Sequence, residues 1–139
     1  MSGHRDPIYG CLLHTGRRDR DGYGRTRSGA LAHVEAWTEL HGSVPPGLQI
    51  DHACRRRACR EPLHLEPVSG SENQLRRSFA YRARRHVCQH GHALTAPLMT
   101  PEGGVLCRTC TREILRVGGG TARPPAPRGR GRRGRTARA

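Results

Sequence analysis

The chain has 139 residues, 34% of them hydrophobic, with one Trp, one Phe and three Tyr. That composition excludes a large apolar core and leaves room for one small domain or two very small ones. No apolar stretch approaches the roughly 20 residues that a membrane-spanning helix needs. The formal net charge is +14 and all 25 basic residues are Arg. A chain this cationic is expected to bind polyanions, and nucleic acid is the first candidate.

Six cysteines and nine histidines must be explained. The start, Met-Ser-Gly-His-Arg-Asp, lacks the apolar run of a signal peptide, which favours a reducing, cytoplasmic setting. In that setting, cysteines near histidines are better explained as zinc ligands than as disulfides. We therefore expect zinc to stabilise this fold.

The first elements follow from short patterns. Residues 1–8 are expected to be a flexible start. Residues 11–15 and 23–27 are typical of two short strands around an Asp-Gly turn. Residues 30–41 carry apolar side chains at helical spacing, and a Gly follows them.

A strand, a cysteine loop and a second strand come next. In residues 48–52 apolar positions alternate, which places His52 on one face of a strand and Asp51 on the other. Residues 63–68 predict the second strand. Ser69 then stands three residues before a Glu, the spacing of a capping box, and predicts a helix that runs to about residue 84.

A second unit is expected to begin near Arg85. A knuckle at 88–92 precedes a hairpin turned at 101–104 and a helix over 111–117. The last stretch, 118–139, is Gly, Pro and Arg without apolar periodicity, so we expect a disordered basic tail that tethers the protein to phosphates.

Ligand spacing predicts two zinc sites. Structural zinc takes four ligands, and the first loop supplies three, Cys54, Cys59 and His64. Cys11 is assigned as the fourth, and the alternative for it is a small buried apolar residue. The second set, with His90 as the alternative to its histidine, is Cys88, His92, Cys107 and Cys110.

The stretch from Ile50-Asp51-His52 to Asn73, with Glu-Pro-Leu-His-Leu-Glu between them, resembles the ββα-metal motif of HNH endonucleases. The likeness is greatest to small phage-encoded members and to the related His-Cys box homing endonucleases, and it covers roughly residues 9–80. It implies a small zinc-stabilised α+β fold, with a ββα-metal nuclease domain at 9–85. A zinc-ribbon or treble-clef unit at 86–117 and the basic tail at 118–139 would follow it.

The resemblance implies roles for single residues. His52 matches the general base that activates water, Asn73 a ligand of one catalytic Mg²⁺ or Mn²⁺, and Asp51 a second ligand of that ion. Arg25 matches an arginine that contacts the scissile phosphate. The Cys11, Cys54, Cys59 and His64 set matches the zinc site of the His-Cys box branch, although in HNH proteins without such a zinc a histidine near His64 binds the catalytic ion instead.

Two positions depart from the family pattern. Glu61 stands where an Asn usually orders the loop and orients the base, which would loosen His52. Val34 replaces a basic residue that often follows the helix histidine, here His33. That histidine either supports the site or is partly buried in the core.

These features predict a metal-dependent endonuclease, a monomer or homodimer, that acts on double-stranded DNA. The alternatives are an inactive zinc-stabilised DNA-binding protein and an RNA-binding or packaging accessory. Nucleic-acid contacts are expected from arginines of the cysteine loop and the following helix: Arg55, Arg56, Arg57, Arg76 and Arg77.

Overall fold

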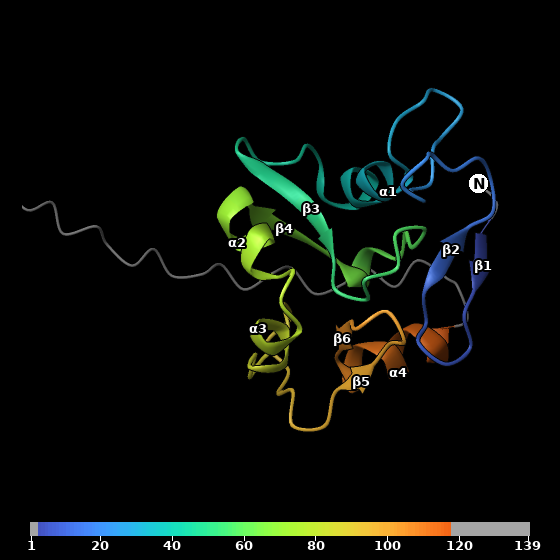
Figure 1. Cartoon of the computed structure of the whole chain (residues 1–139). Coiled ribbons are helices and arrows are strands. Elements are labelled where there is room, and N and C mark those ends of the chain that lie inside the picture. The colour runs from blue at the N-terminus through green and yellow to red at the C-terminus, as the bar shows by residue number, and fades with distance from the viewer. Residues whose placement is uncertain (1–2, 118–139) are drawn as a thin grey trace, which may run out of the picture.

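The computed structural model of this chain describes residues 3–117, and the predicted basic tail lies outside them. Within that range the strands pair as three two-stranded antiparallel sheets. The strands β3 and β4 and the helix α2 lie together, with β1 and β2 to one side and the β5–β6 hairpin with α4 below (Figure 1). The predicted α+β class is confirmed.

The N-terminal strand pair differs from the predicted one. β2 (Leu12–His14) forms where a strand was expected, but it pairs with β1 (Gly3–Arg5), so the prediction of a flexible start is wrong for these residues. The Asp6 carboxylate accepts hydrogen bonds from the backbone of the next turn, at 2.8 Å and 3.0 Å, and closes the connection. Residues 23–27 form no named strand and lie in a loop.

The second edge of β2 meets the cysteine loop. The Arg60 amide donates to the Leu12 carbonyl, and the His14 amide donates to the Ala58 carbonyl, both at 2.8 Å. These bonds bring Cys11 beside the loop, as the sequence predicted.

The central ββα unit follows the prediction closely. β3 (Leu48–His52) pairs with β4 (Leu65–Ser69), and α1 (Ala32–His41) covers them. A short 3₁₀ turn, η1 (Pro62–His64), replaces the start of the predicted second strand. Trp37, Ile50 and Leu65 form the core between helix and strands.

The predicted helix after Ser69 is two helices. The Ser69 hydroxyl accepts from the Glu72 amide at 3.1 Å, so the predicted cap is present. The chain then forms α2 (Gly70–Leu75) and α3 (Phe79–Ala83), with a break around Arg76. The Arg82 guanidinium donates to the Arg76 carbonyl at this break, which satisfies a group that a continuous helix would have bonded internally.

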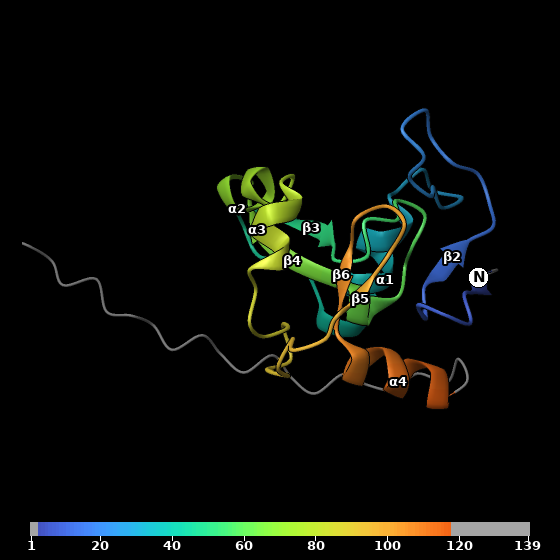
Figure 2. The ribbon, with the colours of Figure 1, turned by 60° about the horizontal axis from the view of Figure 1, so that its bottom comes forward.

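The C-terminal unit packs on the cysteine loop. β5 (Leu98–Met99) and β6 (Val105–Leu106) form the predicted hairpin, and α4 (Arg108–Val117) follows on the opposite side from α2 (Figure 2). The Val105 amide donates to the Ala53 carbonyl at 3.2 Å. The buried side chain of Leu106 joins the core cluster around three cysteines of the first unit.

Candidate active site and zinc centres

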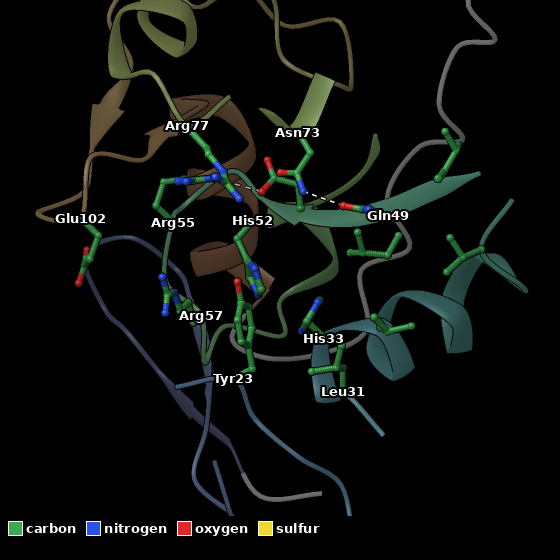
Figure 3. Close-up of a pocket in the computed structure, with 15 residues that line it drawn as sticks. Tyr23, Leu31, His33, Gln49, His52, Arg55, Arg57, Asn73, Arg77 and Glu102 are labelled. Atoms are coloured by element: carbon green, nitrogen blue, oxygen red, sulfur yellow. Dashed lines mark hydrogen bonds and ion pairs between the residues drawn. The ribbon is translucent and has the colours of Figure 1, made fainter. Parts of the chain in front are cut away.

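An open groove of about 960 Å³ lies beside the end of β3. Figure 3 shows the side chains that line it, which come from α1 and the loops before and after it, from β3, from the cysteine loop, from α2 and the turn that follows it, and from the β5–β6 turn. The predicted base and both predicted ion ligands, His52, Asp51 and Asn73, are among them. The fold therefore brings together residues that are up to 22 positions apart in the sequence.

The ring of His52 is fixed by the cysteine loop. It is 5% exposed, and its Nε2 lies 2.9 Å from the carbonyl oxygen of Cys59. Because a carbonyl only accepts, Nε2 carries the proton and Nδ1 is the nitrogen with a free lone pair. Burial lowers the pKa of His52 to about 4, so the imidazole is neutral at neutral pH and able to accept a proton.

Two rings lie beside His52, one from α1 and one from the loop before it. The ring centroid of His33 lies 4.4 Å from that of His52, and the centroid of Tyr23 lies 6.0 Å away. Burial lowers the pKa of His33 to about 3, so this ring is neutral as well. The sequence left two positions open for His33, beside the site or in the core, and the ring is both buried and packed against His52; Tyr23 had no assigned role.

Asn73 and Asp51 offer oxygen atoms to the groove. Asn73 Nδ2 donates to Gln49 Oε1 at 2.8 Å, which leaves the amide oxygen Oδ1 for another partner (Figure 3). Carboxylate and amide oxygens are ligands that Mg²⁺ and Mn²⁺ prefer. The donor set therefore fits a hard divalent cation.

Arg25 does not line this groove. Its guanidinium pairs with the Asp19 carboxylate at 2.9 Å and donates to the Gly29 carbonyl at 3.0 Å. It is not one of the groove residues; the arginines that line the groove are Arg55, Arg57 and Arg77. The phosphate contact by Arg25 stays a prediction.

Arg76 is also placed differently from the prediction. It is 3% exposed and its guanidinium is held by Glu66 at 2.6 Å, Glu72 at 3.0 Å and Asp51 at 3.4 Å. A guanidinium enclosed by three carboxylates is not available to a DNA phosphate. Arg76 instead orients Asp51 from behind the groove.

The first cysteine cluster is enclosed by the fold. Cys11, Cys54 and Cys59 have no exposed surface, and His64 is 2% exposed. His64 Nδ1 lies 3.5 Å from Cys11 Sγ and 3.6 Å from Cys59 Sγ. With zinc–sulfur bonds of about 2.3 Å and zinc–nitrogen bonds of about 2.0 Å, ligand atoms of a tetrahedral site lie about 3.5 to 3.8 Å apart. The four side chains therefore fit a closed zinc site.

The charge state of these thiols agrees with that fit. Hydrogen bonds from Cys54 and Cys59 hold the pKa of Cys11 far below its usual range. Its partners respond in the opposite direction, because a hydrogen bond to Cys11 raises the pKa of Cys54, and burial raises that of Cys59. One sulfur is thus poised as a thiolate, the form that binds zinc.

The second cluster is made of Cys88, His92, Cys107 and Cys110, whose ligand atoms lie within 4.8 Å of one another. His92 Nδ1 is 3.3 Å from Cys110 Sγ and 3.5 Å from Cys88 Sγ. The structure therefore brings His92, and not the alternative His90, into the cluster. The same tetrahedral distances fit zinc here.

Glu61 stabilises the cysteine loop through contacts of its carboxylate. Its carboxylate caps η1 by accepting from the Leu63 amide at 3.3 Å and pairs with Arg5 at 2.5 Å. The acceptor of His52 is the Cys59 carbonyl, two residues earlier, and that contact is intact. The expected loosening of His52 is not seen.

Comparison with known families agrees with this geometry. Residues 30–75, which include α1, β3, the cysteine loop, β4 and all of α2, match the family described as HNH endonuclease. The similarity to HNH endonucleases is confined to this segment of the chain. The HNH segment contains His52, Asp51 and Asn73, and the ββα-metal fold predicted for it is confirmed. HNH endonuclease domains act on DNA.

One relative comes from a phage. The "Uncharacterized gene 5.3 protein" of Enterobacteria phage T3 is 33% identical over 67 residues, which are 42% of this chain and 64% of the phage protein. This chain thus spans less than two thirds of that relative. No solved structure matches the chain. In residues 3–117, no helix has the length and apolar character needed to span a membrane.

Proposed function

We propose that this protein is a metal-dependent endonuclease that hydrolyses phosphodiester bonds of double-stranded DNA, with His52 as the general base. The observation that carries the proposal is the bond from His52 Nε2 to the Cys59 carbonyl, which sets the tautomer of a buried, neutral imidazole. This imidazole lines a groove together with two hard oxygen ligands and three arginines.

The polar residues that line the groove divide the reaction between them. His52 Nδ1 takes the proton from the attacking water. It can do so because the lowered pKa leaves the ring neutral at neutral pH. Asp51 and Asn73 would hold Mg²⁺ or Mn²⁺, which stabilises the charge that develops on the phosphate and leaving oxygens when bound. The arginines Arg55, Arg57 and Arg77 supply positive charge for the DNA backbone.

The two cysteine clusters would each hold one structural Zn²⁺. Each offers four protein ligands and so leaves no open position for chemistry. The first cluster also has a direct link to catalysis, since Cys59 contributes both a thiolate to zinc and the carbonyl that orients His52.

The proposal is tested by incubating the zinc-loaded full chain with a supercoiled plasmid in Mg²⁺, in Mn²⁺ and in EDTA. We expect nicked or linear product with either ion and none in EDTA. Salt-sensitive binding of the plasmid with no product under any condition would contradict the enzyme and favour a DNA-binding protein. A competing RNA that displaces the DNA at equal salt would instead favour an RNA-binding role.

A further inference from the structure

Arg55 has an unusual backbone. In residues 3–117 it is the non-glycine residue with a positive φ, 58°. Left-handed conformations in arginine persist where the surroundings impose them, and they concentrate at functional sites. Arg55 directly follows Cys54 in the cysteine loop, and its side chain turns back to donate to Asp51 Oδ1 at 3.2 Å.

Two arginines hold the Asp51 carboxylate, and they differ in how firmly they are held themselves. Arg76 approaches Oδ2 from the interior and is fixed by two further carboxylates. Arg55 approaches Oδ1 at 3.2 Å from the groove, and its side chain is 25% exposed. Asp51 Oδ1 is therefore the oxygen that a ligand in the groove can reach, and Arg55 is the partner that it would displace.

We infer that the Arg55 guanidinium takes the place of the divalent cation at Asp51 until that cation binds, and that the displaced guanidinium then binds a phosphate of the DNA. This inference rests on the proposed function, because it takes Asp51 as a cation ligand. A divalent ion at Oδ1 repels a guanidinium that was hydrogen-bonded to the same oxygen. A guanidinium also matches phosphate oxygens with two parallel hydrogen bonds, so phosphate is a favourable second partner.

The exchange couples the two ligands of the active site. Without DNA, Arg55 competes with the ion for Asp51 and weakens ion binding. With DNA, the freed guanidinium adds a phosphate contact, so each ligand strengthens the binding of the other by the same factor. The groove thus carries an internal counter-charge for Asp51 that is released when ion and DNA arrive together.

The matched control is Arg57. It lines the same groove, yet its guanidinium donates to the Asp21 carbonyl at 2.6 Å and lies 5.4 Å from the Tyr23 ring centroid. Arg57→Met therefore removes one positive charge from the groove without removing a partner of Asp51. Comparing it with Arg55→Met separates the specific exchange from the general loss of charge.

The experiment uses the zinc-loaded full chain in a His52→Ala background, so that DNA stays intact. Mn²⁺ binding is measured by electron paramagnetic resonance of the free ion, and duplex binding by fluorescence anisotropy with and without Mn²⁺. We expect Arg55→Met to bind Mn²⁺ alone about two- to fivefold more tightly than the parent, as for loss of a partly exposed ion pair. It should also lose the gain in duplex affinity that Mn²⁺ gives the parent, while Arg57→Met keeps that gain.

Mn²⁺ affinity of Arg55→Met no higher than that of Arg57→Met, or a retained gain in duplex affinity, would overturn the exchange. These readouts do not depend on cleavage. If the wild-type chain cleaves DNA but the two arginine variants behave alike, this inference alone is overturned. If the His52→Ala parent binds Mn²⁺ as expected but the wild-type chain cleaves nothing, the proposed function alone is overturned.

Discussion

The two cysteine clusters have the same ligand types but different places in the fold. Cys54 and Cys59 of the first cluster are fully buried and lie between β3 and β4, in the loop that holds His52. In the second cluster Cys88 and His92 are half-buried and belong to a knuckle at the edge of the molecule. The first cluster is therefore part of the loop that borders the proposed active site, whereas the second belongs to the C-terminal unit that packs on this loop.

This contrast shows how a chain with a small apolar core fixes the ring of His52. The carbonyl that orients His52 belongs to Cys59, so any change in ligation of the first cluster reaches the base through one residue. The second cluster reaches the cysteine loop through contacts of the C-terminal unit, among them the bond from the Thr100 hydroxyl to the Cys54 carbonyl at 2.8 Å and the bond from the Val105 amide to the Ala53 carbonyl at 3.2 Å. We therefore expect a substitution in the first cluster to lower DNA cleavage more than the matching substitution in the second cluster.

The largest effect is expected from Cys59→Ser. A structural zinc contributes about 10 kcal/mol or more to folding, which is comparable to the whole stability of a small domain. We expect the zinc content to fall from two to one per chain, the cooperative unfolding transition to be lost at 37 °C, and DNA cleavage to disappear. Metal analysis, thermal denaturation and the plasmid assay check these outcomes.

The matched change in the second cluster is Cys110→Ser. It should also remove one zinc, but the bond between His52 and the Cys59 carbonyl is retained and part of the cleavage should remain. Equal loss of cleavage in the two serine variants would break the contrast between the clusters.

A smaller effect is expected at the contact between the two units. A Cβ on Gly104 would lie 2.3 Å from the Cys54 carbonyl oxygen, whereas a Cβ on Gly70 would meet nothing within 4 Å. Gly104→Ala should therefore lower the free energy of unfolding by about 1 to 3 kcal/mol, as other overpacking changes do. Gly70→Ala should stay within about 0.5 kcal/mol of the wild type. Urea denaturation measures the free energy of unfolding of both variants. Similar free energies would show that the β5–β6 hairpin is not closely packed against the cysteine loop.

The smallest effect concerns pH. The pKa of His33 is about 3 in the folded protein and about 6.5 in an unfolded chain. The unfolded state therefore binds the proton first, and stability that is complete above pH 6.5 is lost as the pH falls toward 3. His33→Phe should lose less free energy of unfolding than the wild type between pH 7 and pH 5. Parallel pH profiles of the two proteins would contradict the buried, neutral ring.

Much of the site could be predicted from the sequence because local patterns determine it. Alternation in residues 48–52 identified β3, the spacing of Ser69 and Glu72 identified the start of α2, and ligand spacing identified both cysteine clusters. Predictions failed where long-range partners decide. The strand Gly3–Arg5 is polar and carries no apolar alternation, so its pairing with β2 left no local signal.

The ion pairs of Arg76 and Arg25 were not predicted either, because the fold decides which carboxylates these side chains meet. Arg76 stands next to Arg77 in a polar stretch, and only the meeting of three carboxylates from β3, β4 and α2 buries it. The pair of Arg25 with Asp19 likewise depends on how the loop before α1 closes. Glu72, four residues before Arg76, was the one local hint of its ion pair.

The central claim is that His52 is the base of a DNA-cleaving site, and His14 is a suitable control for it. His14 is also buried, at 9% exposure, but it lies on β2 and is not one of the groove residues. The measurement is the rate of Mg²⁺-dependent plasmid nicking by the wild type, His52→Ala and His14→Ala, each shown to contain two zinc ions. We expect His52→Ala to be slower by about 10²- to 10⁴-fold, the usual contribution of a general base, while His14→Ala cleaves near the wild-type rate. Cleavage by His52→Ala at the rate of His14→Ala would contradict the account.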